Sequence, residues 1–124
     1  MIKIRDINNF LHKYRNTDKR VIQLSKSEFI ILSRYVNDLN EFDFIKTDDD
    51  FKFPKDIIPI AVDQGGNLIC VSLGESLMSG IYFWDHEEYD DLENAFEFIV
   101  ENFQLLGKMI TDEKNQDLVK FLNS

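Results

Sequence analysis

The sequence predicts an α+β fold in which helices pack against a mainly antiparallel sheet, within one domain over residues 1–124. Its length of 124 residues is typical of a single domain. Short β-branched and aromatic runs, separated by glycine-bearing turns, occupy the middle of the chain and indicate adjacent strands. Apolar residues at helical spacing occur before and after these runs.

Two helices and a loop are expected before the sheet. A capping-box pattern, Ser25 with Glu28 three residues later, predicts a second helix that ends near Asn40. Residues 41–56 are acidic and Pro54 prevents a helix from continuing, so a loop is expected there. The apolar stripes of the two helices are Ile4, Ile7, Phe10, Leu11 and Tyr14 over residues 4–15, then Phe29, Leu32, Val36 and Leu39.

Three strands are expected over residues 57–62, 68–73 and 81–84. The turn over residues 63–67 contains two glycines and joins the first two strands as antiparallel neighbours. The second and third runs are apolar on both faces, which predicts central strands covered on both sides. Pro59 indicates that the first strand lies at or near an edge, since proline cannot donate to a neighbouring strand.

Two further helices are expected after the sheet. Asp90 and Asp91 can cap a third helix, and Gly107 can end it. A short final helix is expected around residues 118–122. The buried stripe of the third helix is Leu92, Phe96, Ile99, Phe103 and Leu106.

The charge is strongly and unevenly acidic. A formal net charge of -9 argues against a nucleic-acid binder and against attraction to an anionic membrane. Residues 1–34 hold 8 bases and 3 acids, whereas residues 35–124 hold 6 bases and 20 acids. The acidic clusters are solvated surface and helix N-termini in one interpretation, and a surface for a basic protein partner in the other. The candidate partner-binding residues are Asp48, Asp49, Asp50, Glu87, Glu88, Asp90, Asp91 and Glu93.

No catalytic residue, metal site or cofactor site is predicted. Cys70 is the only cysteine and lies within an apolar strand, which indicates a structural thiol in a reducing compartment, by default the cytoplasm. His86 has carboxylates nearby but no second His or Cys, so a zinc site is poorly supported. Gly65 and Gly66 lack the residues of a phosphate-binding loop. No secretion signal and no run long enough to span a membrane is visible.

The middle of the chain resembles the SUKH superfamily, which includes yeast cell-wall-assembly regulators of the Smi and Knr type and many bacterial proteins. The resemblance is strongest over residues 53–103 and includes Phe53, Pro54, the turn over residues 63–67, and Ala95 with the residues after it. It implies an α+β domain without enzymatic activity or cofactor. The positions that match the family signature are Asp63, Gly65, Gly66, Asn67, Trp84, Asp85 and His86, and a structural role is favoured for all of them.

Many bacterial members of this superfamily are thought to be immunity proteins that neutralise toxins, often nucleases. The resemblance therefore implies a protein that binds a basic, nuclease-type toxin through its acidic residues. The alternatives are a regulatory scaffold without a toxin partner and, less favoured, a metal-dependent enzyme around His86. Family members usually carry a Leu-Pro pair and an Asn-Gly pair near the front, whereas the first glycine here is Gly65. This departure implies a shortened N-terminal part, in which residues 21–39 match a strand and a helix.

Overall fold

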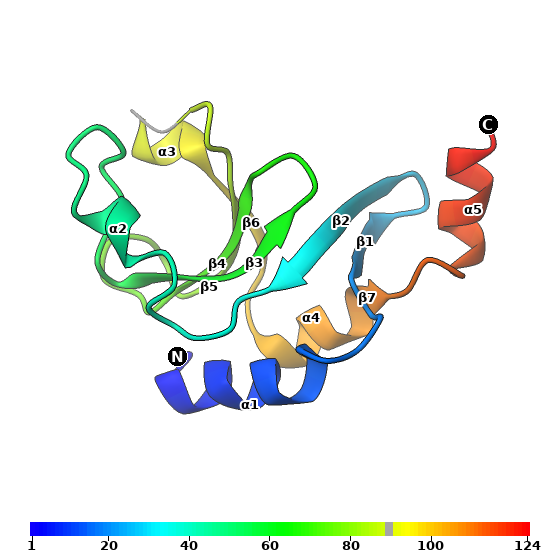
Figure 1. Ribbon diagram of the computed structural model, residues 1–124, viewed down its shortest axis with the longest axis horizontal. Coiled ribbons are helices and arrows are strands. Elements are labelled where there is room, and N and C mark those ends of the chain that lie inside the picture. The colour runs from blue at the N-terminus through cyan, green and yellow to red at the C-terminus, as the bar shows by residue number, and fades with distance from the viewer. Residues whose placement is uncertain (89–90) are drawn as a thin grey trace.

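The computed structural model describes residues 1–88 and 91–124 (Figure 1). Within these residues the chain forms a seven-stranded sheet with the order β6-β5-β4-β3-β2-β1-β7, and every neighbouring pair is antiparallel. This confirms the predicted α+β class. The elements are α1 (Ile4–Tyr14), β1 (Val21–Ser25), β2 (Glu28–Tyr35), α2 (Asp43–Lys46), β3 (Ile57–Asp63), β4 (Leu68–Ser72), β5 (Gly80–Trp84), α3 (Leu92–Ala95), β6 (Phe96–Val100), α4 (Phe103–Met109), β7 (Ile110–Thr111) and α5 (Gln116–Leu122).

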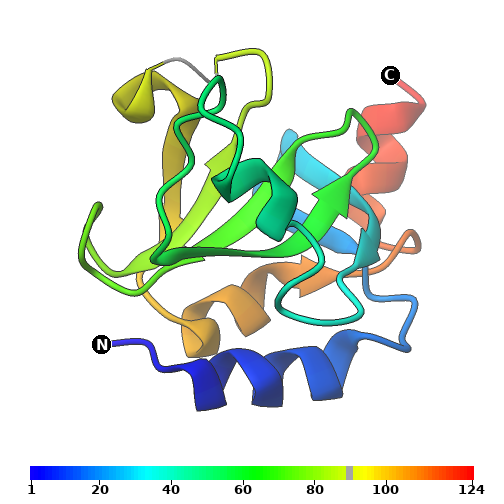
Figure 2. The ribbon, with the colours of Figure 1, turned by 60° about the vertical axis from the view of Figure 1, so that its left-hand side comes forward.

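The central strands are covered on both faces, as predicted. In β4, Ile69 and Val71 belong to the larger core, whereas Leu68 and Cys70 belong to a second core on the opposite face. Figure 2 shows α1 and α4 together below the sheet and α2 in front of it. The buried residues of α1 enter the larger core, and Ile45 of α2 enters the second. Each face of the sheet therefore has its own hydrophobic core.

Several predicted elements are confirmed. The first helix, the three central strands and the turn between β3 and β4 lie where the sequence placed them. The final helix is α5, and the side chain of its N-cap residue Asn115 accepts a hydrogen bond from the Leu118 N–H. In α1, Ile7, Phe10, Leu11 and Tyr14 are buried, while Ile4 at the helix start is partly exposed.

The predicted second helix over residues 25–40 is wrong, because this segment forms the turn of a hairpin and strand β2. Ile30 pairs with Ile22 of β1, and Ile31 pairs with Val21. The Ser25 hydroxyl accepts from the Ser27 N–H and thereby helps to form the hairpin turn instead of capping a helix. Apolar residues from 29 to 32 satisfy a helical stripe and a strand equally well, and the pairing with β1 decides between them.

The predicted third helix is also wrong, because the segment is divided into α3, β6 and α4. Asp91 does act as a cap, since its carboxylate accepts from the Asn94 N–H, but the helix ends at Ala95. Phe96 and Phe98 then pair with Trp84 and Tyr82 of β5. Asp90, the other predicted cap, lies outside the described residues. Aromatic and β-branched residues favour a strand as soon as a neighbouring strand is available.

Gly107 lies inside α4 and does not end it. A Cβ atom at this position would lie 3.3 Å from the hydroxyl oxygen of Tyr14, so the missing side chain allows α4 and α1 to approach closely. Leu106 beside it is buried in the larger core. The glycine therefore serves the packing of two helices, which the helical spacing of the sequence does not reveal.

The expectations for residues 41–56 and for Pro59 need correction. Residues 41–56 contain the short helix α2, and their aromatic side chains cover the second core. Strand β3 is internal, between β2 and β4, so Pro59 does not mark an edge strand. Proline is tolerated because the pairing with β4 shifts register between Pro59 and Ala61, and the pairing with β2 extends only to Ala61.

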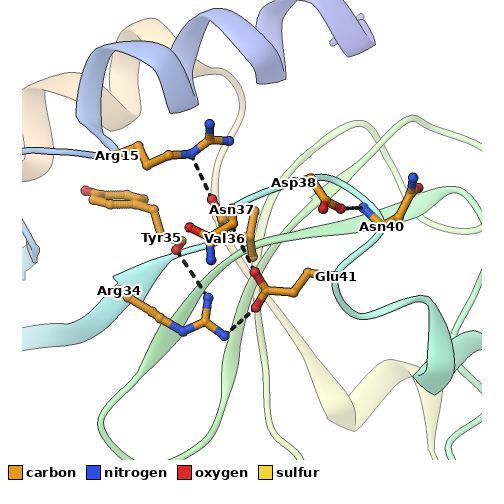
Figure 3. A network of polar contacts seen from close by, with 8 residues as sticks. All are labelled: Arg15, Arg34, Tyr35, Val36, Asn37, Asp38, Asn40 and Glu41. Atoms are coloured by element: carbon orange, nitrogen blue, oxygen red, sulfur yellow. Dashed lines mark hydrogen bonds and ion pairs between the residues drawn. The ribbon is translucent and has the colours of Figure 1, made fainter.

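A polar network holds the chain where it passes from the end of β2 toward α2 (Figure 3). The guanidinium of Arg34 forms an ion pair with Glu41, whose other carboxylate oxygen accepts from the Asn37 N–H at 2.9 Å. Hydrogen bonding to Arg34 lowers the pKa of Glu41, and the same contact raises the pKa of Arg34. Arg15, just after α1, donates to the Val36 carbonyl at 3.0 Å. These contacts connect α1, β2 and the segment that leads to the second core.

Asp56 is a buried carboxylate that ties the start of β3 to the loop before β5. Its Oδ2 atom accepts from the N–H groups of Glu75 and Ser76 at 2.9 and 3.0 Å, and its Oδ1 accepts from the Ser76 hydroxyl at 2.6 Å. Burial acts to raise the pKa of Asp56, but the hydrogen bonds from Ser76 and Glu75 outweigh it and lower the pKa. The charged form is therefore the one that the folded protein stabilises.

Replacing Asp56 with Asn is expected to lower the free energy of unfolding by about 1–3 kcal/mol at neutral pH, because an amide group would meet donors that need an acceptor. Since the folded-state pKa is lowered, this stabilisation is present above the unfolded pKa of about 3.9 and is lost as the pH falls through the folded-state value. Urea denaturation between pH 7 and pH 3 measures the difference. The control is Asp49→Asn at an exposed position, and an equal effect of both variants at pH 7 would contradict the prediction.

Candidate functional site

The family-signature residues of the β3–β4 turn form one hydrogen-bonded unit. The Asp63 carboxylate accepts from the N–H groups of Gly65 and Asn67, each at 2.8 Å. The Asn67 side-chain amide donates to the other oxygen of Asp63 at 3.3 Å. Gly66 has a φ of +86°, in the left-handed region that favours glycine. Asp63 thus fixes a turn that the glycines make possible.

The same unit holds the residue that follows β5. The Asn67 Oδ1 atom accepts from the His86 backbone N–H at 3.2 Å and lies 2.6 Å from His86 Nδ1. Because the amide nitrogen of Asn67 faces a carboxylate, its oxygen faces His86, and a carbonyl oxygen only accepts. His86 Nδ1 therefore carries the proton. Asp63 and Asn67 of the turn and His86, which is 19 residues further along the chain than Asn67, form one chain of polar contacts.

Trp84 and Asp85 connect this unit to the second core and to α3. Trp84 is 2% exposed and contacts the rings of Phe51, Phe53 and Phe96 edge-on or tilted, with centroid distances of 5.3 to 6.5 Å. The Asp85 N–H donates to the Ala95 carbonyl at 2.8 Å, and its carboxylate accepts from the Glu87 N–H at 2.9 Å. All seven signature residues thus take part in turns, strand ends or packing, and their structural role stays a prediction.

The structure brings the two acidic segments to the same end of the molecule. Asp50 directly precedes Phe51 and Asp85 directly follows Trp84, and these two rings lie 5.9 Å apart. Figures 1 and 2 both show the loop after α2 at the same end of the molecule as α3. We call this surface the acidic end. It is formed by exposed carboxylates from both segments, namely Asp48, Asp49, Asp50, Glu87, Glu88 and Asp91.

Two candidate residues cannot be placed on this surface. Asp90 lies outside the described residues, and the side chain of Glu93 in α3 is not described. Of the other carboxylates, Asp48 accepts from the Asp50 N–H at 3.0 Å, and Asp91 accepts from the side chain of Asn94 at 2.6 Å. These bonds fix the shape of the two segments while the carboxylates stay exposed to solvent.

The bases near the N-terminus and the acids of the acidic end lie at different ends of the folded molecule. Helix α1 contains Arg5 and Lys13 and is followed by Arg15, Lys19 and Arg20. In both views α1 lies at the end of the molecule opposite α3 and the loop after α2. Such a separation orients a charged partner before contact and raises the rate of productive encounters.

Cys70 and His86 are the two residues that the sequence analysis considered for chemistry. Within residues 1–88 and 91–124, no three His, Cys, Asp or Glu side chains lie close enough together to hold a metal ion. Cys70 is fully buried, and burial raises the pKa of its thiol well above the usual value, which disfavours the reactive thiolate. In the part of the chain that the structure describes, no helix is long and apolar enough to cross a membrane.

The residues that bring the acidic segments together are not evident from the sequence. Phe51 and Phe53 belong to the segment in which a loop is expected, but their rings pack on Trp84 and so determine where the preceding aspartates lie. The signal was present as aromatic residues spaced along an acidic segment. Their alternation with polar residues gives no hint of which strand they would contact.

The antiparallel α+β fold, with its turn held against the end of β5, agrees with the domain that the SUKH resemblance implies. The family described as SMI1-KNR4 cell-wall, SUKH_6, matches residues 4–105. The chain therefore belongs to this family, and the match also includes the segment before residue 53 in which the sequence resemblance was weak. Strand β7 and helix α5 lie beyond the matched residues. The expected shortening of the N-terminal part stays a prediction.

A curated relative comes from a Bacillus prophage. The SPbeta prophage-derived uncharacterized protein YokK of Bacillus subtilis (strain 168) is 35% identical over 77 residues. The matched stretch covers 57% of this chain and 38% of the relative, so the chain spans well under half the length of that protein.

Replacing Asn67 with Ala is expected to lower the free energy of unfolding by about 1–2 kcal/mol, because Asp63 and His86 each lose a hydrogen-bond partner. Chemical denaturation measures this change. Gln64→Ala in the same turn is the control, since Gln64 is exposed and its substitution should change stability by less than about 0.5 kcal/mol. Equal stability of the Asn67 variant and the unmodified chain would show that the polar unit does not support the fold.

The two turn glycines are expected to respond differently to alanine. Gly66→Ala should lower the free energy of unfolding by about 1–2 kcal/mol, since a residue with a side chain is strained at a φ of +86°. Gly65→Ala is the matched control, because its added Cβ would make only ordinary contacts with Asn67 and Asp63, at 3.4 and 3.5 Å. Thermal unfolding of both variants checks the difference, and a greater loss at Gly65 would refute this account of the turn.

Proposed function

We propose that this protein is an immunity-type protein that binds and neutralises a basic, nuclease-type toxin through the acidic end. The observation that carries the proposal is the convergence of two separate acidic segments on one exposed surface. Membership of the SMI1-KNR4 family and a relative from a prophage are consistent with such a role. The partner is defined by its chemistry, a protein surface rich in Lys and Arg.

The proposed mechanism is stoichiometric occlusion. Clustered carboxylates attract a cationic surface over a distance of about 10 Å at moderate ionic strength, so they accelerate encounter and select basic partners. The signature unit of Asp63, Asn67 and His86 holds the scaffold, and the exposed acids supply the contacts. A nuclease surface that binds phosphates is basic by necessity, so an acidic protein can cover the surface that would otherwise contact nucleic acid.

A non-catalytic role follows from the same reasoning. The proposed function needs no nucleophile, and burial disfavours the thiolate of Cys70. His86 Nδ1 is engaged with Asn67. We therefore expect inhibition to be complete at an equimolar ratio and to involve no turnover of the partner.

Co-expression with the C-terminal domain encoded by the neighbouring gene tests the proposal. The expected result is rescue of growth together with co-purification of the two proteins in equal amounts. Co-purification with a neighbouring protein that is not toxic would favour the regulatory scaffold instead. Toxicity that persists although both proteins are folded and abundant would refute the immunity function.

Charge reversal at the acidic end tests the surface itself. The triple variant Asp49→Lys, Glu87→Lys and Glu88→Lys should slow association with the partner by about tenfold or more, and added salt should reduce the difference. The control reverses the exposed Glu75, Glu101 and Glu113, which changes the net charge equally outside the acidic end. Association rates measured by surface plasmon resonance should separate the two variants. Equal slowing in both would mean that net charge alone matters.

A further inference from the structure

The curled sheet leaves an open groove between its β1–β2 hairpin and strand β6. The groove has a volume of about 390 Å³. Leu24 and Glu28 of the hairpin lie on one side of it, and Glu97 and Phe98 of β6 lie on the other. Met109, at the end of α4, also lines it. The groove is thus the part of the sheet's curled face that α1 and α4 leave uncovered.

Strand β6 is an edge strand that borders this groove. In the described sheet it pairs with β5 and has no neighbour on its other side. Glu97 pairs with Phe83 on one face, whereas the ring of Phe98 packs on Tyr82 on the opposite face, with centroids 5.5 Å apart. Three successive residues of β6, Glu97, Phe98 and Ile99, line the groove, and β6 is the last strand of the described sheet. The backbone edge of β6 is therefore accessible from the groove.

The lining of the groove is apolar with two acidic groups. Phe98 and Leu24 are 42% and 41% exposed, so both offer apolar surface to an occupant of the groove. Glu28 and Glu97 are exposed carboxylates on opposite sides of the groove. Charge complementarity therefore favours an occupant with both apolar and basic side chains.

We propose that this groove binds an extended segment of a partner protein, in which basic and apolar residues alternate, by adding a strand to the open edge of β6. The main chain of the segment would pair with residues 96–98. Its apolar side chains would contact Phe98 on one face of the sheet, and its basic side chains would reach Glu97 and Glu28 on the other face. This inference rests on the groove alone and does not require that the partner be a toxin.

Two features of β6 define the occupant further. The pairing with β5 shifts register between Ile81 and Tyr82, so Ile99 is an extra residue that interrupts regular pairing between Phe98 and Val100. Only a short stretch of edge is therefore available, and the apolar groove must supply the remaining affinity. A second copy of this chain is disfavoured, because pairing of β6 with β6 would bring Glu97 close to its counterpart, and like charges that face each other destabilise a sheet.

The probe is a short capped peptide in which lysine and valine alternate, titrated into the isotope-labelled full chain and followed by NMR. The expected result is a saturable shift of the amide signals of residues 96–98 and of Leu24 and Glu28. Two comparison peptides carry glutamate in place of lysine, or a methyl group on every backbone nitrogen. Each should bind at least about tenfold more weakly, because one loses charge complementarity and the other loses its backbone donors.

Two variants with matched controls test the assignment to β6. Glu97→Lys should weaken binding of the lysine peptide and strengthen binding of the glutamate peptide. Glu101→Lys, outside the groove, should leave the order of the two affinities unchanged. Phe98→Ala should weaken the binding of both peptides more than Phe44→Ala does. Phe44 lies on α2 and is 63% exposed, so it serves as the control. The inversion of peptide preference by Glu97→Lys distinguishes a binding role from a purely structural one.

Several outcomes would overturn the inference. These are the absence of saturable shifts, equal binding of the methylated peptide, shifts confined to the acidic end, and self-association of the chain through β6. Because the peptide assay uses no toxin, its failure leaves the proposed immunity function standing. Failure of growth rescue, in turn, leaves the groove assignment standing.

Discussion

Strands β3, β4 and β5 carry apolar side chains on both faces, and the rest of the structure depends on covering both of them. Leaving either face in water would forfeit about 1.5–3 kcal/mol for each large side chain that is now buried. Helices α1 and α4 cover one face with Ile7, Leu11 and Leu106. On the other face, Ile45 of α2 and the Phe53 ring pack around Trp84. The polar network around Arg34 and Glu41 lies where the chain passes between these two coverings.

The covering of the second face also determines where the acidic residues lie. Phe51 and Phe53 are anchored on Trp84, so the aspartates just before them are held at the same end as the acids that follow β5. The contact of Asn67 with His86 fixes the start of that second acidic segment. The residues that match the family signature thus support a surface to which they contribute few exposed charges.

The secondary structure could be predicted where only one interpretation suited the local pattern. The spacing of Ile7, Leu11 and Tyr14 suits a helix and not a strand, and the glycine-bearing turn after Asp63 suits a hairpin. The patterns of residues 29–32 and 96–100 are compatible with a helix and with a strand, since apolar and aromatic runs can form the buried stripe of a helix or a buried strand. Residues 29–32 form a strand because they pair with β1, and residues 96–100 form a strand because they pair with β5.

The sequence by itself determined the fold class, the two-sided burial of β4 and β5, the turn built on Asp63 and Gly66, and the uneven distribution of charge. All of these depend on residue type and short-range spacing. Only the tertiary structure decided that Phe51 lies against Trp84, that the two acidic segments share one end, and that β6 borders an open groove. Each of these depends on contacts between residues far apart in the chain, and the register that brings them together is a property of the whole sheet.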